Sequence, residues 1–186
     1  MVLAKRLSLT KRYVGGKEAN KHRSKRNSGN IGGKGKEAVF SLVERGGKVR
    51  SHHVANVTAK TLRPIMDEQI AEATRTMSDD GGARARHGSP DHHSVNHSIG
   101  EYVRGDVHTN TIEGYFSIMK RGIVGVYHHV SPQHLKRYLA EFDFRYNERM
   151  ALNVSDVERA AKAVKGVVGK RVTYQDAASR PDGVSV

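Results

Sequence analysis

A glycine pair inside a β-rich segment is the feature that most constrains the fold. The run EAVFSLVERGGKVRSHHV places Gly46 and Gly47 between two stretches with strand-like composition, residues 38–44 and 48–54. Glycine readily adopts the positive φ that a tight hairpin turn requires. The pattern therefore predicts two antiparallel strands joined at Gly46-Gly47.

A helical pattern follows the hairpin. Thr58 can cap a helix whose apolar positions recur at helical spacing, namely Leu62, Ile65, Met66 and Ile70. Pro64 would be costly deep inside this helix, so it indicates either a kink or a late helix start.

Short strands and helices alternate in the rest of the chain. The predicted elements are strands over residues 75–79 and 92–97, a helix over 111–121 ended by Gly122, a longer helix opened by Ser131 and Pro132, and a short helix over 156–164. This order, without an internal repeat, predicts a mixed α/β fold.

The charge of the chain points to a polyanionic partner. The sequence has 186 residues, a formal net charge of +13 and no cysteine. Such a basic balance favours nucleic acid over a membrane surface, and the missing cysteines exclude disulfides and thiolate zinc sites in this chain. No apolar run is long enough for a membrane span and no signal peptide is recognisable, so we expect a cytoplasmic protein.

A basic loop concentrates part of this charge. Residues 17–36 contain one acid, Glu18, among many cations: Lys17, Lys21, Arg23, Lys25, Arg26, Lys34 and Lys36. The composition predicts a flexible loop, which is either a solvated linker or an arm that grips phosphates.

Two acids are candidates for a metal site. Asp79 stands where a predicted strand meets a glycine-rich turn, and Glu113 lies in the first turn of the helix in HTNTIEGYFSIMK. Carboxylates converging from a strand end and a helix can hold divalent cations for phosphoryl chemistry. Lys120 follows Glu113 by two helical turns and therefore lies on the same helix face.

Structural roles would also account for these residues. Asn110 and Glu113 have the spacing of a capping box, in which the glutamate only satisfies backbone N–H groups. Lys120 and Arg121 at a helix end complement the helix dipole. Asp79 and Asp80 can both be turn acids, and spacing alone leaves these alternatives open.

A series of motifs resembles a known family. They are Tyr13-Val14-Gly15-Gly16-Lys17-Glu18, His108-x-Asn110-x-x-Glu113, Lys120-Arg121-Gly122, Gly125-x-Tyr127-His128, His134-Leu135, Arg145-Tyr146-Asn147 and Gly169-Lys170-Arg171. In this order they resemble the catalytic domain of ISXO-like insertion-sequence transposases of bacteria, in the DDE superfamily.

The resemblance implies a fold, a chemistry and a site. The fold is RNase H-like, and two Asp and one Glu hold two Mg²⁺ or Mn²⁺ ions that catalyse DNA strand cleavage and transfer. By position, Asp79 matches the second Asp and Glu113 the Glu, which makes both catalytic and metal-binding candidates. The implied DNA contacts are Lys120, Arg121, His108 and Asn110 and, on the basic loop, Lys17, Lys21, Arg23, Lys25 and Arg26.

The chain departs from the family at the first acid. The family strand ends in Asp-Glu-Thr-Tyr, whereas this chain has Thr10-Lys11-Arg12-Tyr13. A threonine hydroxyl brings no charge, so it cannot replace a carboxylate that bridges two divalent ions. Reading Asp-Glu-Thr codons one base late gives Thr-Lys-Arg, so we hypothesise that residues 1–12 are a frameshifted first strand; restoring one base near codon 12 should recover the acid.

The sequence predicts one domain organisation, and it leaves two candidate functions. We expect a degraded first strand and basic loop over residues 1–36, the RNase H-like catalytic domain over 37–150, and a C-terminal helix with a basic tail over 151–186. The expected function is that of an N-terminally truncated transposase with impaired catalysis, acting on DNA at the nucleoid and forming a homo-oligomer there. The alternative is a non-catalytic basic nucleic-acid-binding protein, such as a repressor of related transposases.

Overall fold

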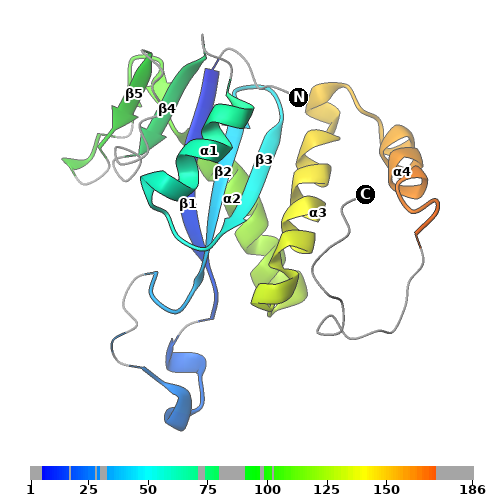
Figure 1. Cartoon of the computed structure of the whole chain (residues 1–186). Helices are drawn as coiled ribbons and strands as arrows, with labels where there is room; N and C mark the ends of the chain where they lie inside the picture. The colour runs from blue at the N-terminus through cyan, green and yellow to red at the C-terminus, as the bar shows by residue number, and fades with distance from the viewer. Residues whose placement is uncertain are drawn as a thin grey trace.

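A five-stranded mixed sheet with helices on both faces forms the core of the protein (Figure 1). The computed structural model describes residues 6–16, 18–27, 29, 33–70, 74–79, 91–96, 99–101 and 103–170. The strand order is β3-β2-β1-β4-β5. The strands are β1 Arg6–Val14, β2 Glu37–Glu44, β3 Val49–Val54, β4 Arg75–Asp79 and β5 His92–Val95.

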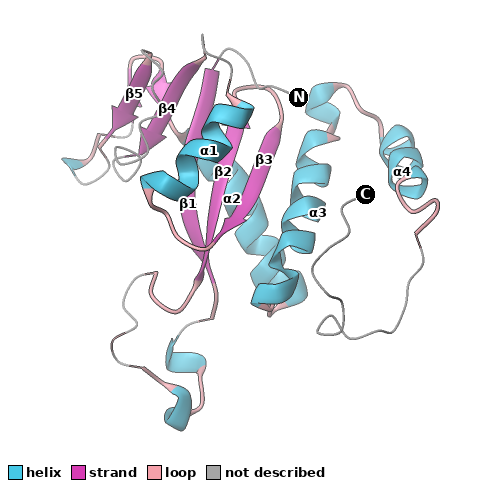
Figure 2. Ribbon diagram, viewed as in Figure 1, coloured by secondary structure: helices cyan, strands magenta, loops and turns pink. Residues whose placement is uncertain are grey.

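Strand directions agree with the expected fold class. β1, β2 and β3 pair antiparallel, whereas β4 is parallel to β1 and β5 is parallel to β4. The predicted hairpin is confirmed, and Gly46 has the positive φ of 70° that its turn requires. The mixed sheet with flanking helices confirms the α/β prediction and is consistent with an RNase H-like fold (Figure 2).

The first strand occupies the centre of the sheet. Although the sequence led us to expect a degraded strand, Arg6–Val14 pairs with β2 over residues 7–14 and with β4 over residues 6–9. Its side chains alternate between faces, so Leu7 and Leu9 pack on one side and Val14 packs on the other. The first strand thus has regular strand geometry and pairing on both sides.

One face of the sheet is covered by α1, Ala59–Gln69. Leu62 and Met66 of α1 pack against Leu7, Leu9 and their neighbours on β2. Thr58 is the N-cap as predicted, although its side chain accepts no capping hydrogen bond from the helix backbone. The helix continues through Pro64, so the alternative of a late start is wrong.

The other face is covered by α2, Asn110–Gly122, and α3, Leu135–Asn147. Their buried side chains meet those of β1, β2 and β3 in one cluster, with Tyr115, Phe116, Met119, Leu139 and Phe142 among its members. The predicted opening of the long helix is confirmed, since Ser131 caps a 3₁₀ turn over Pro132–His134 that leads into α3.

The α-helical part of α2 ends at Gly122, close to the expected end, but the backbone stays helical beyond it. The helix passes into a π-helix, Ile123–Tyr127. A Cβ on Gly122 would lie 2.6 Å from ring atoms of Phe142, so glycine is needed there because α3 approaches α2 closely.

Smaller elements complete the described chain. β6 Val103–Arg104 and β7 Val107–His108 form a hairpin before α2, and 3₁₀ turns cover Glu18–Asn20, Arg23–Lys25 and Met150–Leu152. The predicted C-terminal helix is confirmed as α4, Asp156–Lys165, with a capping box between Ser155 and Glu158. In the described parts of the chain, no helix is long and apolar enough to span a membrane.

Candidate active site

The strand pairing of β1 and β4 brings Thr10 to Asp79. Leu9 pairs with Ser78, so the following residues lie side by side on the sheet face that α2 covers. The Thr10 hydroxyl donates a hydrogen bond of 2.6 Å to Oδ2 of Asp79. Oδ1 of Asp79 is buried and accepts no hydrogen bond from any described residue. One carboxylate oxygen is therefore satisfied by threonine, and the other is left for a further donor or a cation.

Glu113 comes from the first turn of α2. The N-cap is Thr109, whose hydroxyl donates a hydrogen bond of 3.1 Å to Oε1 of Glu113. The capping box considered for Asn110 and Glu113 is not formed, because Asn110 already lies inside the helix and is exposed. The Glu113 carboxylate is thus held to the start of the helix by a side chain.

The start of α2 and the Thr10–Asp79 pair lie on the same side of the sheet. The guanidinium of Arg12 lies 5.8 Å from the centre of the Phe116 ring. Thr10 precedes Arg12 by two residues on the same strand face, and Glu113 precedes Phe116 by about one helical turn. The helix start and the Thr10–Asp79 pair consequently share one side of the sheet.

The described residues contain no group of three or more His, Cys, Asp or Glu side chains that could hold a metal ion. Asp79 and Glu113 are the two acids expected to hold a metal, and Thr10, which donates to Asp79, is a neutral side chain only 3% exposed. The buried hydroxyl makes this position neutral, so the local negative charge is lower than three carboxylates would supply.

His108 is the last residue of β7 and precedes the start of α2, which carries Glu113. Burial lowers the pKa of its imidazole, Arg45 lowers it further, and Asp106 opposes both effects. Its Nδ1 is buried without a hydrogen-bond partner among the described residues. The ring is therefore neutral at pH 7 and cannot attract phosphate by charge.

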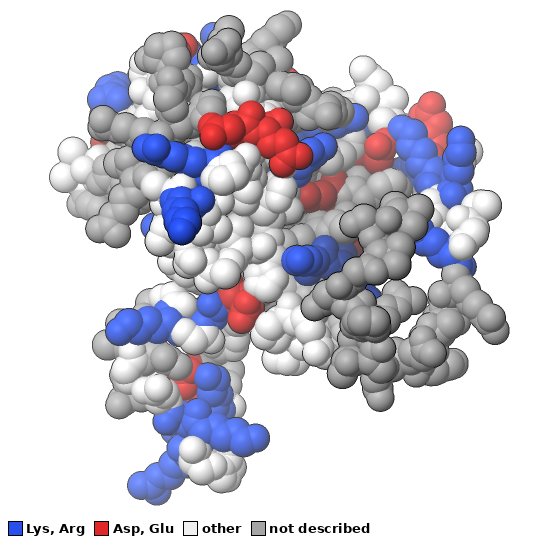
Figure 3. Space-filling model, viewed as in Figure 1, with Lys and Arg blue, Asp and Glu red and all other residues white. Residues whose placement is uncertain are grey.

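The basic loop forms an arm that projects from the ends of β1 and β2 (Figure 1), and basic side chains gather on it (Figure 3). Arg26 donates hydrogen bonds to the carbonyl oxygens of Lys21 at 2.9 Å and Ala19 at 2.7 Å, and Lys21 pairs with Glu18. The predicted contacts Lys21 and Arg26 thus also hold the arm together.

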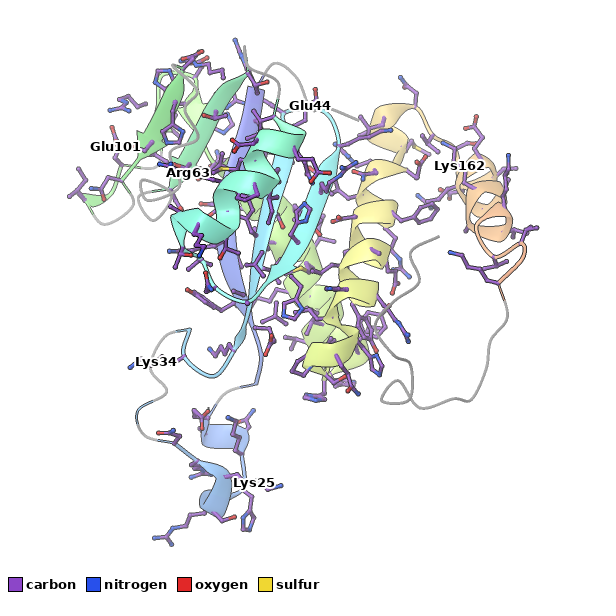
Figure 4. All side chains as sticks on the ribbon, in the orientation of Figure 1. Lys25, Lys34, Glu44, Arg63, Glu101 and Lys162 are labelled. Atoms are coloured by element: carbon purple, nitrogen blue, oxygen red, sulfur yellow. The ribbon has the colours of Figure 1, made fainter. Side chains whose placement is uncertain are left out.

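Other predicted cations on the arm and α2 are free of such contacts. Arg23 and Lys25 are exposed and form no ion pair with any described residue, and Figure 4 shows Lys25 near the arm's outer end. Lys120 and Arg121 are exposed at the end of α2 and likewise have no ion pair within the described chain. Lys17, also predicted to contact DNA, lies outside the described residues.

Sequence reasoning missed a polar network beneath α2. The Tyr115 hydroxyl donates to Asp143 Oδ1 at 2.6 Å, and Ser51 donates to the same carboxylate through its backbone N–H at 2.7 Å and its hydroxyl at 2.8 Å. Burial, together with Asp143, strongly raises the pKa of Tyr115. These partners are far apart in sequence, so no local spacing could have revealed them.

The network continues across the sheet toward the two acids. Ser41 donates to Ser51 at 2.8 Å and is the strand neighbour of Thr10. A row of polar side chains therefore crosses four strands, from Asp79 on β4 through Thr10 and Ser41 to Ser51 on β3.

Comparison with known proteins identifies one family. The family described as ISXO2-like transposase domain matches residues 3–147, and the matched segment includes Thr10, Asp79 and Glu113. No curated protein and no solved structure matches the chain.

Proposed function

Because the chain belongs to the ISXO2-like transposase family, we propose that it is a DNA-binding transposase domain with impaired metal-dependent phosphoryl transfer. The observation that carries this proposal is the hydrogen bond from Thr10 to Asp79. Thr10 stands at the position of the first family acid, where a neutral hydroxyl replaces a carboxylate.

Asp79 and Glu113 are the residues that would hold a divalent cation. Mg²⁺ commonly binds one or two carboxylates and keeps several waters, which this pair and the unpartnered Asp79 Oδ1 can accommodate. When bound, Mg²⁺ or Mn²⁺ supplies Lewis-acid polarisation and a more acidic water. A second ion lacks its bridging carboxylate, so we expect one weakly held ion instead of two.

The DNA contacts proposed here are mainly to the phosphate backbone. Arg23 and Lys25 on the arm and Lys120 and Arg121 on α2 are exposed cations available for phosphates. Lys17, Lys21 and Arg26 add charge to the arm, while Asn110 and the neutral His108 can only donate or accept hydrogen bonds. Binding of this kind is sequence-tolerant and weakens with salt.

A titration of duplex binding against salt tests the DNA contacts. Replacing Arg23 and Lys25 together by alanine should lower the slope of log K against log salt by about 1.8 if both contact phosphates. The control for loss of charge is Lys60→Ala. Lys60 is exposed on α1, which covers the sheet face opposite α2. An unchanged slope in the double variant would remove the arm from the proposed interface.

A strand-transfer assay with Mg²⁺ tests the impairment. The wild-type chain should show little or no joining of a transposon-end DNA to a target plasmid. Robust transfer that is lost in Glu113→Gln would contradict the proposed impairment, and single-strand nicking without joining would indicate a nuclease that works with one ion.

A non-catalytic nucleic-acid-binding protein, such as a repressor of related transposases, is the second candidate. It is favoured by the same neutral Thr10, together with the exposed cations of the arm. Calorimetric titration with Mn²⁺ distinguishes the two: heat of binding that disappears in Asp79→Asn supports a remaining metal site, and absence of binding in the wild type supports the non-catalytic protein.

A further inference from the structure

A groove of about 420 Å³ lies between α2, the following π-helix and α3. Its apolar residues include Ile118, Val126 and Phe142, and its basic residues are Arg121, Arg145 and Arg149. Its size falls within the usual range of ligand sites. Neither Asp79 nor Glu113 lines this groove, so it is separate from the candidate active site.

The apolar part of the groove is open to solvent. Ile118 is 48% exposed and Val126 is 69% exposed, although both are large aliphatic side chains. The close approach of Phe142 to Gly122 joins the two helices below them. An occupant with flat apolar surfaces would remove this area from water.

The wall formed by the π-helix has unusual backbone geometry. His128, directly after it, has φ 57° and ψ −43°, and His129 N–H donates back to the Tyr127 carbonyl at 2.5 Å. This is the geometry of the rare γ-turn with positive φ, which is strained for a residue with a Cβ. π-Helical segments and such strain are frequent at functional sites.

The arginines give the groove an excess of positive charge. Arg121 forms no ion pair with a described residue, and Arg145 pairs with Glu141 at 2.9 Å. Arg149 lies 3.9 Å from the centre of the Tyr146 ring and donates to the Gly47 carbonyl at 3.0 Å. Arg145 lies in the last turn of α3 and Arg149 follows two residues after the helix end, and both line the groove.

We propose that this groove binds a single strand of DNA. The arginines contact successive phosphates, and the apolar residues Ile118, Val126 and Phe142 contact unstacked bases. This surface shares Arg121 with the phosphate contacts proposed above, but it goes beyond the proposed function because it binds unstacked bases and requires neither the metal site nor the arm.

The chemistry favours a single strand over the other polyanions. A duplex presents phosphates but keeps its bases stacked inside, which would leave the apolar residues facing water; a single strand offers both surfaces at once. Three arginines and no lysine line the groove, and the guanidinium group matches phosphate oxygens in a two-pronged geometry. An acidic peptide would satisfy the charge but would bring fewer flat surfaces.

Fluorescence anisotropy with a labelled oligothymidylate and with a duplex of equal length tests the proposal. Ile118→Asn and, separately, Val126→Asn change no charge, and each should weaken binding of the single strand roughly tenfold while leaving the duplex nearly unaffected. Val164→Asn, at an exposed valine of α4, is the matched control and should change neither.

Arginine variants test the charged part of the same groove. Arg145→Ala should lower the salt slope for the single strand by about 0.7. Arg137→Ala removes the same charge from an exposed position of α3 outside the groove and should have a smaller effect on the single strand. Circular dichroism of each variant separates lost binding from lost folding.

Three results would overturn the proposal. They are equal losses for duplex and single strand in Ile118→Asn, no loss in either asparagine variant, and displacement of the oligothymidylate by polyglutamate at lower charge concentration than by unlabelled oligothymidylate. The last result would assign the groove to an acidic peptide.

Discussion

Replacing Thr10 by aspartate should place a second carboxylate beside Asp79. In the absence of metal, this change should lower the stability of the fold. The hydroxyl of Thr10 lies 2.6 Å from Asp79 Oδ2 and its side chain is buried. Thr10→Asp removes a hydrogen bond to a charged group, worth about 1.5–3 kcal/mol. It also sets a second charge near the first, where repulsion reaches about 4 kcal/mol at 4 Å and an effective dielectric constant of about 20.

Sharing of a proton limits this repulsion. Two adjacent carboxyls raise the pKa of one of them, so the folded state of the variant takes up a proton that the unfolded state does not hold at neutral pH. Stability of the variant should therefore fall as pH rises above the ordinary range of an aspartate. At pH 7 we expect a net loss of about 2–4 kcal/mol, or roughly 5–15 °C in melting temperature for a chain of this size.

Divalent metal should reverse the loss. A cation that binds only the folded state stabilises it by about 2.7 kcal/mol when its concentration is 100 times Kd. The assay is thermal unfolding in chelator and in Mg²⁺ or Mn²⁺. Thr10→Asn, with nearly the same shape and no charge, should lack the gain from metal. The reasoning is refuted if Thr10→Asp melts like the wild type in chelator, or if both variants respond equally to metal.

Other predictions concern the layer between the sheet and α2. Tyr115→Phe leaves the Asp143 carboxylate short of a donor and should cost about 1–3 kcal/mol in urea unfolding; an unchanged midpoint would show that the network adds nothing. Gly122→Ala forces a methyl group against Phe142 and should lower stability by about 1–3 kcal/mol in thermal melts, unless α3 can shift away. The lowered pKa of His108 means that the unfolded chain binds the proton more readily, so its contribution to stability is present above about pH 6.5 and is lost as pH falls toward the lower folded value. Titration of its ring by NMR should give a midpoint below the ordinary histidine value of about 6.5.

Local sequence patterns were sufficient for most of the fold. Strand alternation, the Gly46-Gly47 turn and the caps at Thr58 and Ser131 act within a few residues, so they could be recognised before any tertiary contact was known. Where prediction failed, a distant residue decided. Gly122 was expected only to stop a helix, whereas its missing side chain lets Phe142 of α3 approach and the backbone continues as a π-helix.

The sequence also determined which reactive side chains are present. It has Asp79 and Glu113, and it has a threonine in place of an acid at position 10. Only the tertiary structure decided what these residues touch. Parallel pairing of β1 with β4 places the hydroxyl of Thr10 on Asp79, residues separated by 69 positions. The packing of α3 against α2 likewise creates the arginine-lined groove. Such contacts depend on strand register and helix packing, which many distant residues fix together.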